Sequence, residues 1–147
     1  MALILSVTVV VLVALGLWIK TGRDRRLLDE HTITPEALHA LMDAKHEVLL
    51  FDVRQPLDLL ADSEIIPGAT RLDPEQVIEN PSLIPKEKDS VLYCTCPSDK
   101  TARMILQKAL ALKFLRVKFL RGGLDAWKAK GYPVEPYKKP FHLDTLV

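Results

Sequence analysis

The feature of this sequence that most constrains its fold is the alternation of short apolar runs with amphipathic segments across most of the chain. The apolar runs have the length of strands, and the segments between them repeat their apolar residues at helical spacing. Strands that alternate with helices predict an α/β fold, with a parallel sheet and helices on both of its faces. The predicted strands are residues 47–53, 65–72 (a turn and a short strand), 90–94 and 117–120, and the predicted helices are residues 34–44, 55–62, 73–80, 100–114 and 122–131.

Two of the predicted helices carry clear start signals. Thr34 and Asp73 are suited to cap a helix, and each is followed by a proline, which the first helical position tolerates. The helix at residues 100–114 has the most regular apolar stripe, and we expect that face to be buried. The stripe consists of Ala102, Ile105, Leu106, Ala109 and Leu112.

Two of the predicted strands end in chemically active side chains. Asp52 and Arg54 stand at the end of one strand, and Cys94 ends another. In parallel sheets with helices on both faces, ligands bind beyond the carboxyl ends of the strands. The sequence therefore predicts that Cys94 lies at the ligand-binding edge of the sheet.

The segment after Cys94 has the features of an anion-binding loop. If residues 95–100 curl over the strand end, their backbone N–H groups and the N-terminus of the next helix converge on Cys94 Sγ. Such surroundings lower the pKa of a thiol, and Lys100 and Arg103 add positive charge, with Asp99 facing outward as a cap. The predicted loop residues are Thr95, Cys96, Pro97, Ser98, Asp99 and Lys100. The loop alone leaves a nucleophile, an inert buried thiol and a metal ligand as alternatives for Cys94.

Composition narrows the classes of partner. The chain has 147 residues, a formal net charge of +1 and two cysteines, Cys94 and Cys96. This charge gives no field that would attract nucleic acid, so we expect no nucleic-acid partner. A pair of cysteines one residue apart is too close for an ordinary structural disulfide, and no histidine stands at metal-ligand spacing from it. We therefore expect no metal and no cofactor.

The N-terminal segment predicts a membrane anchor. Residues 2–19 carry no charge, and as a helix they would extend about 27 Å, close to the thickness of the hydrocarbon core of a bilayer. Nothing basic precedes this run and its end offers no signal-peptide cleavage site, so a retained single-pass anchor is favoured. Basic residues follow the run, which predicts that the following domain is cytoplasmic at the cell membrane. The predicted divisions are an anchor at 1–20, a charged tether at 21–30, a domain at 31–137 and a tail at 138–147.

Four stretches of the sequence resemble one known family in their order and spacing. They are "LLFDVR", "IPGATRL", "VLYC" with its loop and long helix, and "VKFLRGGLDAWKAKGYPVE". Together they resemble a single rhodanese (sulfurtransferase) domain, over about residues 32–136. The resemblance implies a rhodanese-like parallel sheet of about five strands with helices on both faces, here preceded by the predicted transmembrane helix.

The rhodanese resemblance assigns a reaction to Cys94, which matches the active-site cysteine of the family. It implies that Cys94 takes a sulfane sulfur from a small donor such as thiosulfate, holds it as a persulfide and passes it to a thiol or other thiophilic acceptor. Asp52 and Arg54 match the Asp-x-Arg of the family, and we expect them to form a structural, charge-assisted link near the loop. Trp127 and Gly123 are expected to serve packing and the turn.

Departures from the family pattern keep other functions open. The stretch from Cys94 to Lys100 is seven residues long, where rhodanese loops most often have six and an arginine near the end. A seven-residue loop resembles the phosphatase and arsenate-reductase branch of the fold, although lysine lacks the bidentate fork of arginine. The "C-x-C-P" form resembles a bacterial membrane-associated rhodanese subgroup. Cys96 could serve as a resolving thiol, so a non-catalytic persulfide-carrying or redox-sensing module is a further alternative.

Overall fold

The computed structural model describes residues 2–95 and 100–139, although the side chains of residues 2–6, 24–25, 27–28 and 100–103 fall outside the description. The chain divides into two compact units, residues 1–31 and residues 32–147, and each is described by itself. The first unit contains the helix α1 (Ala2–Glu30). The second unit contains the sheet and all of the other described helices.

Helix α1 is continuous through the segment that was predicted as a tether. Its large apolar side chains between Val7 and Ile19 are exposed, and Trp18 is 75% exposed. Within the described part of the chain, no helix combines the length and the apolar character needed to cross a membrane. The predicted span also includes residues 2–6, whose side chains lie outside the description.

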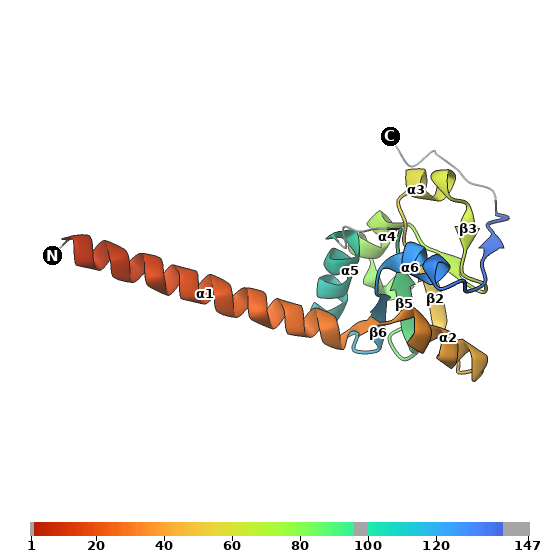
Figure 1. Cartoon of the computed structure of the whole chain (residues 1–147), viewed down its shortest axis with the longest axis horizontal. Helices are drawn as coiled ribbons and strands as arrows, with labels where there is room; N and C mark the ends of the chain where they lie inside the picture. The colour runs from red at the N-terminus through yellow and green to blue at the C-terminus, as the bar shows by residue number, and fades with distance from the viewer. Residues whose placement is uncertain (1, 96–99, 140–147) are drawn as a thin grey trace. The chain divides into compact units, whose positions relative to one another are not determined.

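The second unit is built on a five-stranded sheet with the strand order β1-β6-β5-β2-β4, in which every pair is parallel. Strand β5 lies at the centre, between β6 and β2 (Figure 1). The prediction of an α/β fold with a five-stranded parallel sheet is therefore confirmed. The strands are β1 (Thr32–Ile33), β2 (Leu49–Asp52), β4 (Thr70–Arg71), β5 (Ser90–Tyr93) and β6 (Val117–Leu120).

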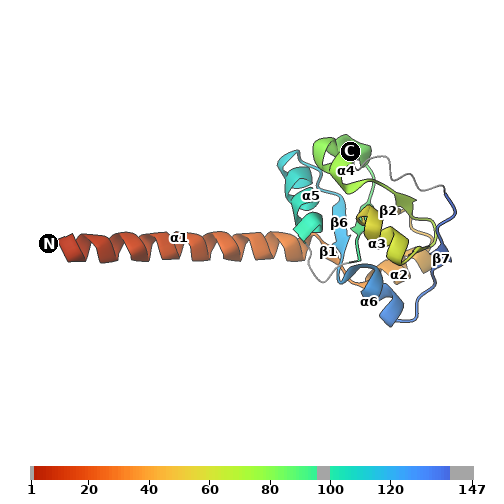
Figure 2. The ribbon, with the colours of Figure 1, turned by 90° about the horizontal axis from the view of Figure 1, so that it is seen from above.

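Helices cover both faces of the sheet. Figure 2 shows α2 and α6 on one face and α4 and α5 on the other. The predicted caps are present, since Thr34 Oγ1 accepts a hydrogen bond from the Ala37 N–H at 3.2 Å and Asp73 Oδ1 accepts one from the Glu75 N–H at 2.9 Å. The helices are α2 (Pro35–Asp43), α3 (Pro56–Ala61), α4 (Pro74–Glu79), a 3-10 turn (Pro81–Leu83), α5 (Lys100–Ala111) and α6 (Gly123–Ala129).

Helix α5 ends three residues earlier than the sequence pattern predicts. Its stripe residues Ile105, Leu106 and Ala109 are buried as expected. Leu112, however, is 50% exposed, so its predicted burial is wrong. The helix ends at Ala111 and Lys113 has a φ of 62°, so the chain turns away before Leu112 can extend the stripe.

A second, two-stranded antiparallel sheet joins β3 (Glu64–Ile65) to β7 (Glu135–Pro136). The sequence pattern did not indicate β1, β3 or β7, because two-residue strands are too short to show any periodicity. The equally short β4 was expected only as the strand that follows a turn. This small sheet brings the end of the domain beside the segment that follows α3. It therefore helps to hold that segment at the edge of the main sheet.

Candidate active site

Cys94 lies at the carboxyl end of the central strand of the sheet. It follows β5 directly, and all four residues of β5 are buried. Cys94 itself is 9% exposed. Because β2, β5 and β6 are parallel, their carboxyl ends lie at the same edge, which is where sheets of this class bind ligands.

Backbone hydrogen bonds fix the chain around Cys94 from the end of β2 and from the start of α6. The Val53 N–H, just after β2, donates to the Tyr93 carbonyl at 2.9 Å. The Leu124 N–H, in the first turn of α6, donates to the Cys94 carbonyl at 2.9 Å. The turn before Leu124 depends on Gly122, whose φ of 72° strains any residue with a side chain. The carbonyl of Cys94 is thus held by a glycine-dependent turn.

Only part of the predicted anion-binding loop lies within the description. Residues 96–99, including Cys96, Pro97, Ser98 and Asp99, lie outside it, as do the side chains of Lys100 and Arg103. Helix α5 begins at Lys100, as the sequence pattern predicts. The Thr95 hydroxyl oxygen is buried and has no hydrogen-bond partner among the described residues. The anion-binding role of the loop stays a prediction.

Asp52 and Arg54 form a buried ion pair beside the strand that carries Cys94. The Arg54 Nε donates to both Asp52 oxygens at 2.9 Å, and Arg54 Nη2 lies 2.5 Å from Asp52 Oδ2. Both residues are fully buried. Burial alone would lower the pKa of Arg54, but the Asp52 carboxylate outweighs it and raises that pKa above its ordinary value. Arg54 therefore stays charged.

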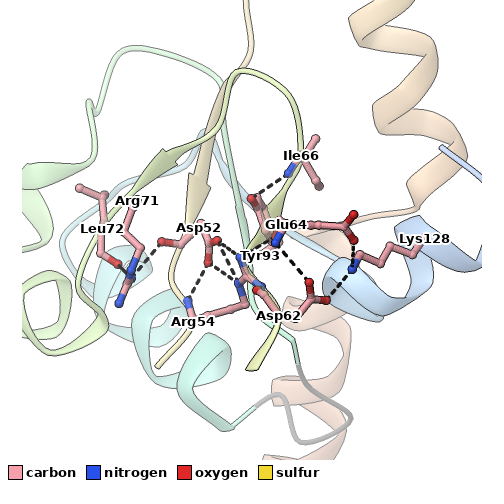
Figure 3. Close-up of polar contacts among 9 residues, drawn as sticks. All are labelled: Asp52, Arg54, Asp62, Glu64, Ile66, Arg71, Leu72, Tyr93 and Lys128. Atoms are coloured by element: carbon pink, nitrogen blue, oxygen red, sulfur yellow. Dashed lines mark hydrogen bonds and ion pairs between the residues drawn. The ribbon is translucent and has the colours of Figure 1, made fainter. Parts of the chain in front are cut away.

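Arg54 also ties the segment after α3 to the end of β2, as Figure 3 shows. Its Nη1 donates to the Asp62 carbonyl at 2.7 Å, and its Nη2 donates to the Glu64 carbonyl at 2.9 Å. Nearby, the Ile66 N–H donates to the Tyr93 hydroxyl at 3.2 Å. Burial, together with the negative charge of Asp52, raises the pKa of Tyr93, so Tyr93 remains a neutral phenol.

Lys128 of α6 joins the same segment from the other side. Its Nζ lies 2.5 Å from Asp62 Oδ2 and 2.5 Å from Glu64 Oε2. Burial would lower the pKa of Lys128, but its bonds to the two carboxylates raise it. Conversely, Lys128 lowers the pKa of Asp62 against the opposing effect of burial. Two cations thus hold residues 62–64 beside the edge that carries Cys94.

Sequence motifs predict Asp52 and Arg54 as part of this site but do not predict Asp62, Glu64, Tyr93 or Lys128. Asp52 and Arg54 stand two residues apart, so a local motif reveals them. Lys128 and Asp62 are separated by 66 positions, and no local spacing relates them. The described residues include no group of three or more His, Cys, Asp or Glu side chains that could hold a metal ion.

The arrangement suits nucleophilic chemistry at a thiol. Cys94 Sγ stands at a strand end, its backbone is fixed on both sides, and a helix of twelve residues begins a few residues later. A helix N-terminus favours negative charge, whether on a thiolate or on a bound anion. A positioned thiolate can attack an electrophilic atom and form a covalent intermediate.

Comparison with known proteins agrees with this geometry. The model of the Rhodanese-like domain family matches residues 34–130. A protein named "Sulfurtransferase" from Allochromatium vinosum is 32% identical over 104 residues, which cover 69% of this chain and 92% of that protein.

Solved structures show the same fold. A thiosulfate sulfurtransferase from Pseudomonas aeruginosa superposes with a TM-score of 0.59 and 23% identity, over 76% of this chain and 21% of that one. A Rhodopseudomonas palustris structure, described as a protein of unknown function and possible tyrosine phosphatase, superposes with a TM-score of 0.61 and 24% identity, over 76% of this chain and 93% of that one. The family model and the Allochromatium relative together establish that this chain belongs to the Rhodanese-like domain family.

Proposed function

We propose that this chain transfers a sulfane sulfur from thiosulfate or a similar donor to a thiophilic acceptor through a persulfide on Cys94. The Cys94 thiolate attacks the outer sulfur of thiosulfate, a new S–S bond forms, and sulfite leaves with the electron pair of the broken bond. An acceptor nucleophile then takes the outer sulfur and releases the thiolate. The observation that carries the proposal is the position of Cys94 at the end of the central strand in a rhodanese-like fold.

Two features near Cys94 support the handling of an anionic sulfur. The Thr95 hydroxyl is buried without a partner among the described residues, so it is available to donate to a persulfide or to thiosulfate. The N-terminus of α5 adds partial positive charge. We assign residues 95–100 to binding of the anion and Arg103 to supporting charge.

The test is thiocyanate formation from thiosulfate and cyanide by the full chain in detergent. Cys94→Ser should lower the rate at least about a thousandfold, because it removes the nucleophile. Cys96→Ser is the matched control and should keep most of the activity, because the loop would bind the anion through backbone N–H groups, which this substitution retains. After thiosulfate treatment, mass spectrometry should find one added sulfur atom on Cys94. Full activity in Cys94→Ser would refute the assignment.

A second candidate is a phosphatase or arsenate reductase, favoured by the seven residues from Cys94 to the start of α5 at Lys100. Hydrolysis of an aryl phosphate without thiocyanate formation would support it. A non-catalytic persulfide carrier or redox module is a third candidate. It would show a stable added sulfur atom, or a bond between Cys94 and Cys96, without turnover.

We also propose that residues 2–19 anchor the chain in the cell membrane as a single span, with the domain in the cytoplasm, as in a membrane-associated rhodanese subgroup. The support is the absence of charge from residues 2–19 and the exposed apolar side chains from Val7 to Ile19. The test is membrane fractionation with carbonate extraction. The full chain should stay in the membrane fraction, and a chain lacking residues 2–19 should not. Recovery of the full chain in the carbonate extract would refute the anchor.

A further inference from the structure

The edge of the sheet opposite Cys94 carries an exposed group of lysines and leucines. Strands β2 and β6 begin at this edge, and the turns before them leave their side chains at the surface. Together with the last residues after α5 they form what we call the basal surface. The basal surface consists of Lys45, His46, Leu112, Lys113, Leu115 and Lys118.

The basal surface combines apolar side chains with a hollow. Leu115 is 68% exposed and Leu112 is 50% exposed. Beside them lies a hollow of about 350 Å³, with Leu41 and Val48 in its lining and Lys118 among its charged residues. Large exposed leucines next to a hollow are typical of surfaces that are covered by a partner.

The exposed positive charge at this edge of the sheet favours an anionic partner. Two acids there are already neutralised, since Glu47 lies 2.5 Å from Lys88 and Asp89 lies 2.9 Å from Arg116. Among the described residues, Lys45, Lys113 and Lys118 form no ion pair. Glu87 also forms none, and Asp43 at the end of α2 contacts only His39, which is charged only if protonated. The basal surface therefore has an excess of exposed positive charge around its leucines.

The path of the chain identifies the anionic partner as a membrane surface. Strand β1 runs parallel to β6 and pairs with its last two residues, so the chain enters β1 from the side of the basal surface. His31 alone separates β1 from the end of α1. Residues 20–30 belong to α1 and rise by about 16 Å as a helix. With residues 2–19 in a bilayer, chain connectivity keeps the start of β1 within that reach of the lipid headgroups.

We propose that the basal surface docks on a membrane containing anionic phospholipids, with Leu112 and Leu115 at the acyl boundary and the lysines on lipid phosphates. Lysines around exposed apolar side chains bind such surfaces by combining electrostatic attraction with apolar burial. The docking rests on the anchor proposed above. It turns the Cys94 edge of the sheet away from the lipid, so that an acceptor reaches Cys94 from the aqueous side.

The experiment places a fluorophore at the basal surface of the full chain in vesicles. In a Cys94→Ser and Cys96→Ser background, Leu115→Cys is labelled, and Leu57→Cys on exposed α3 serves as the matched control. The vesicles contain phosphatidylcholine with or without about one-third phosphatidylglycerol, plus a lipid with a headgroup quencher. In anionic vesicles we expect roughly threefold stronger quenching at 115 than at 57, and added salt should reduce the difference.

Charge reversal tests which lysines contribute to the docking. Lys113→Glu with Lys118→Glu should lower the quenching at 115 to the level seen at 57. Lys138→Glu with Lys139→Glu changes the net charge by the same amount. These two residues follow Tyr137, whose N–H donates to the Ser63 carbonyl near α3, so they lie away from the basal surface. This double variant should therefore leave the quenching at position 115 unchanged. In the chain with native cysteines, neither pair should change thiocyanate formation in detergent.

The outcomes separate the docking from the anchor and from the reaction. Flotation of the chain with vesicles reports the anchor, and thiocyanate formation reports the reaction. Flotation with equal quenching at 115 and 57 would refute the docking alone, whereas loss of flotation would refute both the anchor and the docking. A further measurement uses an aqueous quencher in lipid-free detergent. If position 115 is shielded there, and the shielding increases with protein concentration, a second copy of the chain covers the basal surface. That result would also refute the docking.

Discussion

Arg54 at the carboxyl edge of the sheet and Arg116 at the opposite edge each pair with an aspartate, but in different surroundings. Arg54 and Asp52 are fully buried, and the remaining donors of Arg54 bind the carbonyls of Asp62 and Glu64. Arg116 and Asp89 have side chains 53% and 56% exposed. Buried pairs are costly to break, whereas exposed pairs contribute little. The difference indicates that the edge around Cys94 is held in one geometry, whereas the ion pair at the opposite edge is open to solvent.

The largest effect on stability is expected from breaking the buried pair. Arg54→Met should lower the free energy of unfolding by about 3–5 kcal/mol, because it leaves Asp52 charged and buried and removes two donors from the 62–64 segment. Urea unfolding of the full chain in detergent measures this loss. The double variant Asp52→Asn with Arg54→Met should recover part of it, since no buried charge remains. A loss below about 1 kcal/mol in Arg54→Met would contradict the role given to the pair.

The glycine turn beside Cys94 gives the next largest effect. A Cβ at Gly122 would meet Ala126 Cβ at 2.6 Å, and the φ of 72° is strained for any side chain. We expect Gly122→Ala to cost about 2 kcal/mol and to lower sulfur transfer, because the turn positions the Leu124 N–H on the Cys94 carbonyl.

Gly131→Ala is the matched control for this turn. Gly131 has nearly the same φ, 73°, but open space around its Cβ position, and it lies after α6. It should cost about 1 kcal/mol and leave the rate of thiocyanate formation unchanged. Equal effects of the two variants on that rate would show that the turn at Gly122 has no special connection to Cys94.

Sequence patterns predicted those parts of the fold that are specified locally. The strands β2, β5 and β6 follow from buried apolar runs, and the caps at Thr34 and Asp73 follow from side chains that bond their own helix. Strand β1 could not be predicted, because its two residues become a strand only through pairing with β6. The exposure of Leu112 depends on the positive φ of Lys113, which an apolar stripe does not reveal.

The residues of the candidate site also fall into two groups, those in local motifs and those brought together only by the fold. Cys94, Asp52 and Arg54 stand in recognisable short motifs, and the sequence indicated each of them. The contacts of Lys128 with residues 62–64 could not be predicted from the sequence, because Lys128 and Asp62 are 66 positions apart and no local pattern relates them. The basal surface was also missed, since its residues come from separate turns.

The contacts of Lys128 with Asp62 and Glu64 should stabilise the fold to an extent that depends on pH. Lys128→Met should lower the free energy of unfolding by about 1 kcal/mol at pH 7. Lys128 lowers the folded pKa of Asp62, so this stabilisation is present above the unfolded pKa of about 3.9 and is lost as pH falls through the lower folded pKa. The raised pKa of Lys128 places the alkaline loss above about pH 10.4.

Urea unfolding between pH 2 and pH 8 measures this pH-dependent stabilisation. The stability difference between the native chain and Lys128→Met should be constant from pH 5 to pH 8 and should shrink below about pH 4. Lys130→Met is the control on the same stretch of chain, because Lys130 pairs with Glu36 at a more exposed position. It should show a smaller difference at every pH. A difference for Lys128→Met that persists unchanged at pH 2 would contradict an ion-pair origin.

The smallest effect is expected at the opposite edge of the sheet. Arg116→Gln removes the contacts to Asp89 and to the Glu87 carbonyl, but solvent replaces them because the side chains are half exposed. We expect no measurable change in the urea midpoint, and no change in the rate of thiocyanate formation. Arg116 lies in the lining of the hollow beside the basal surface, so vesicle quenching at position 115 should fall slightly in the same variant. A loss of stability comparable to that of Arg54→Met would mean that the two edges do not differ as their exposure indicates.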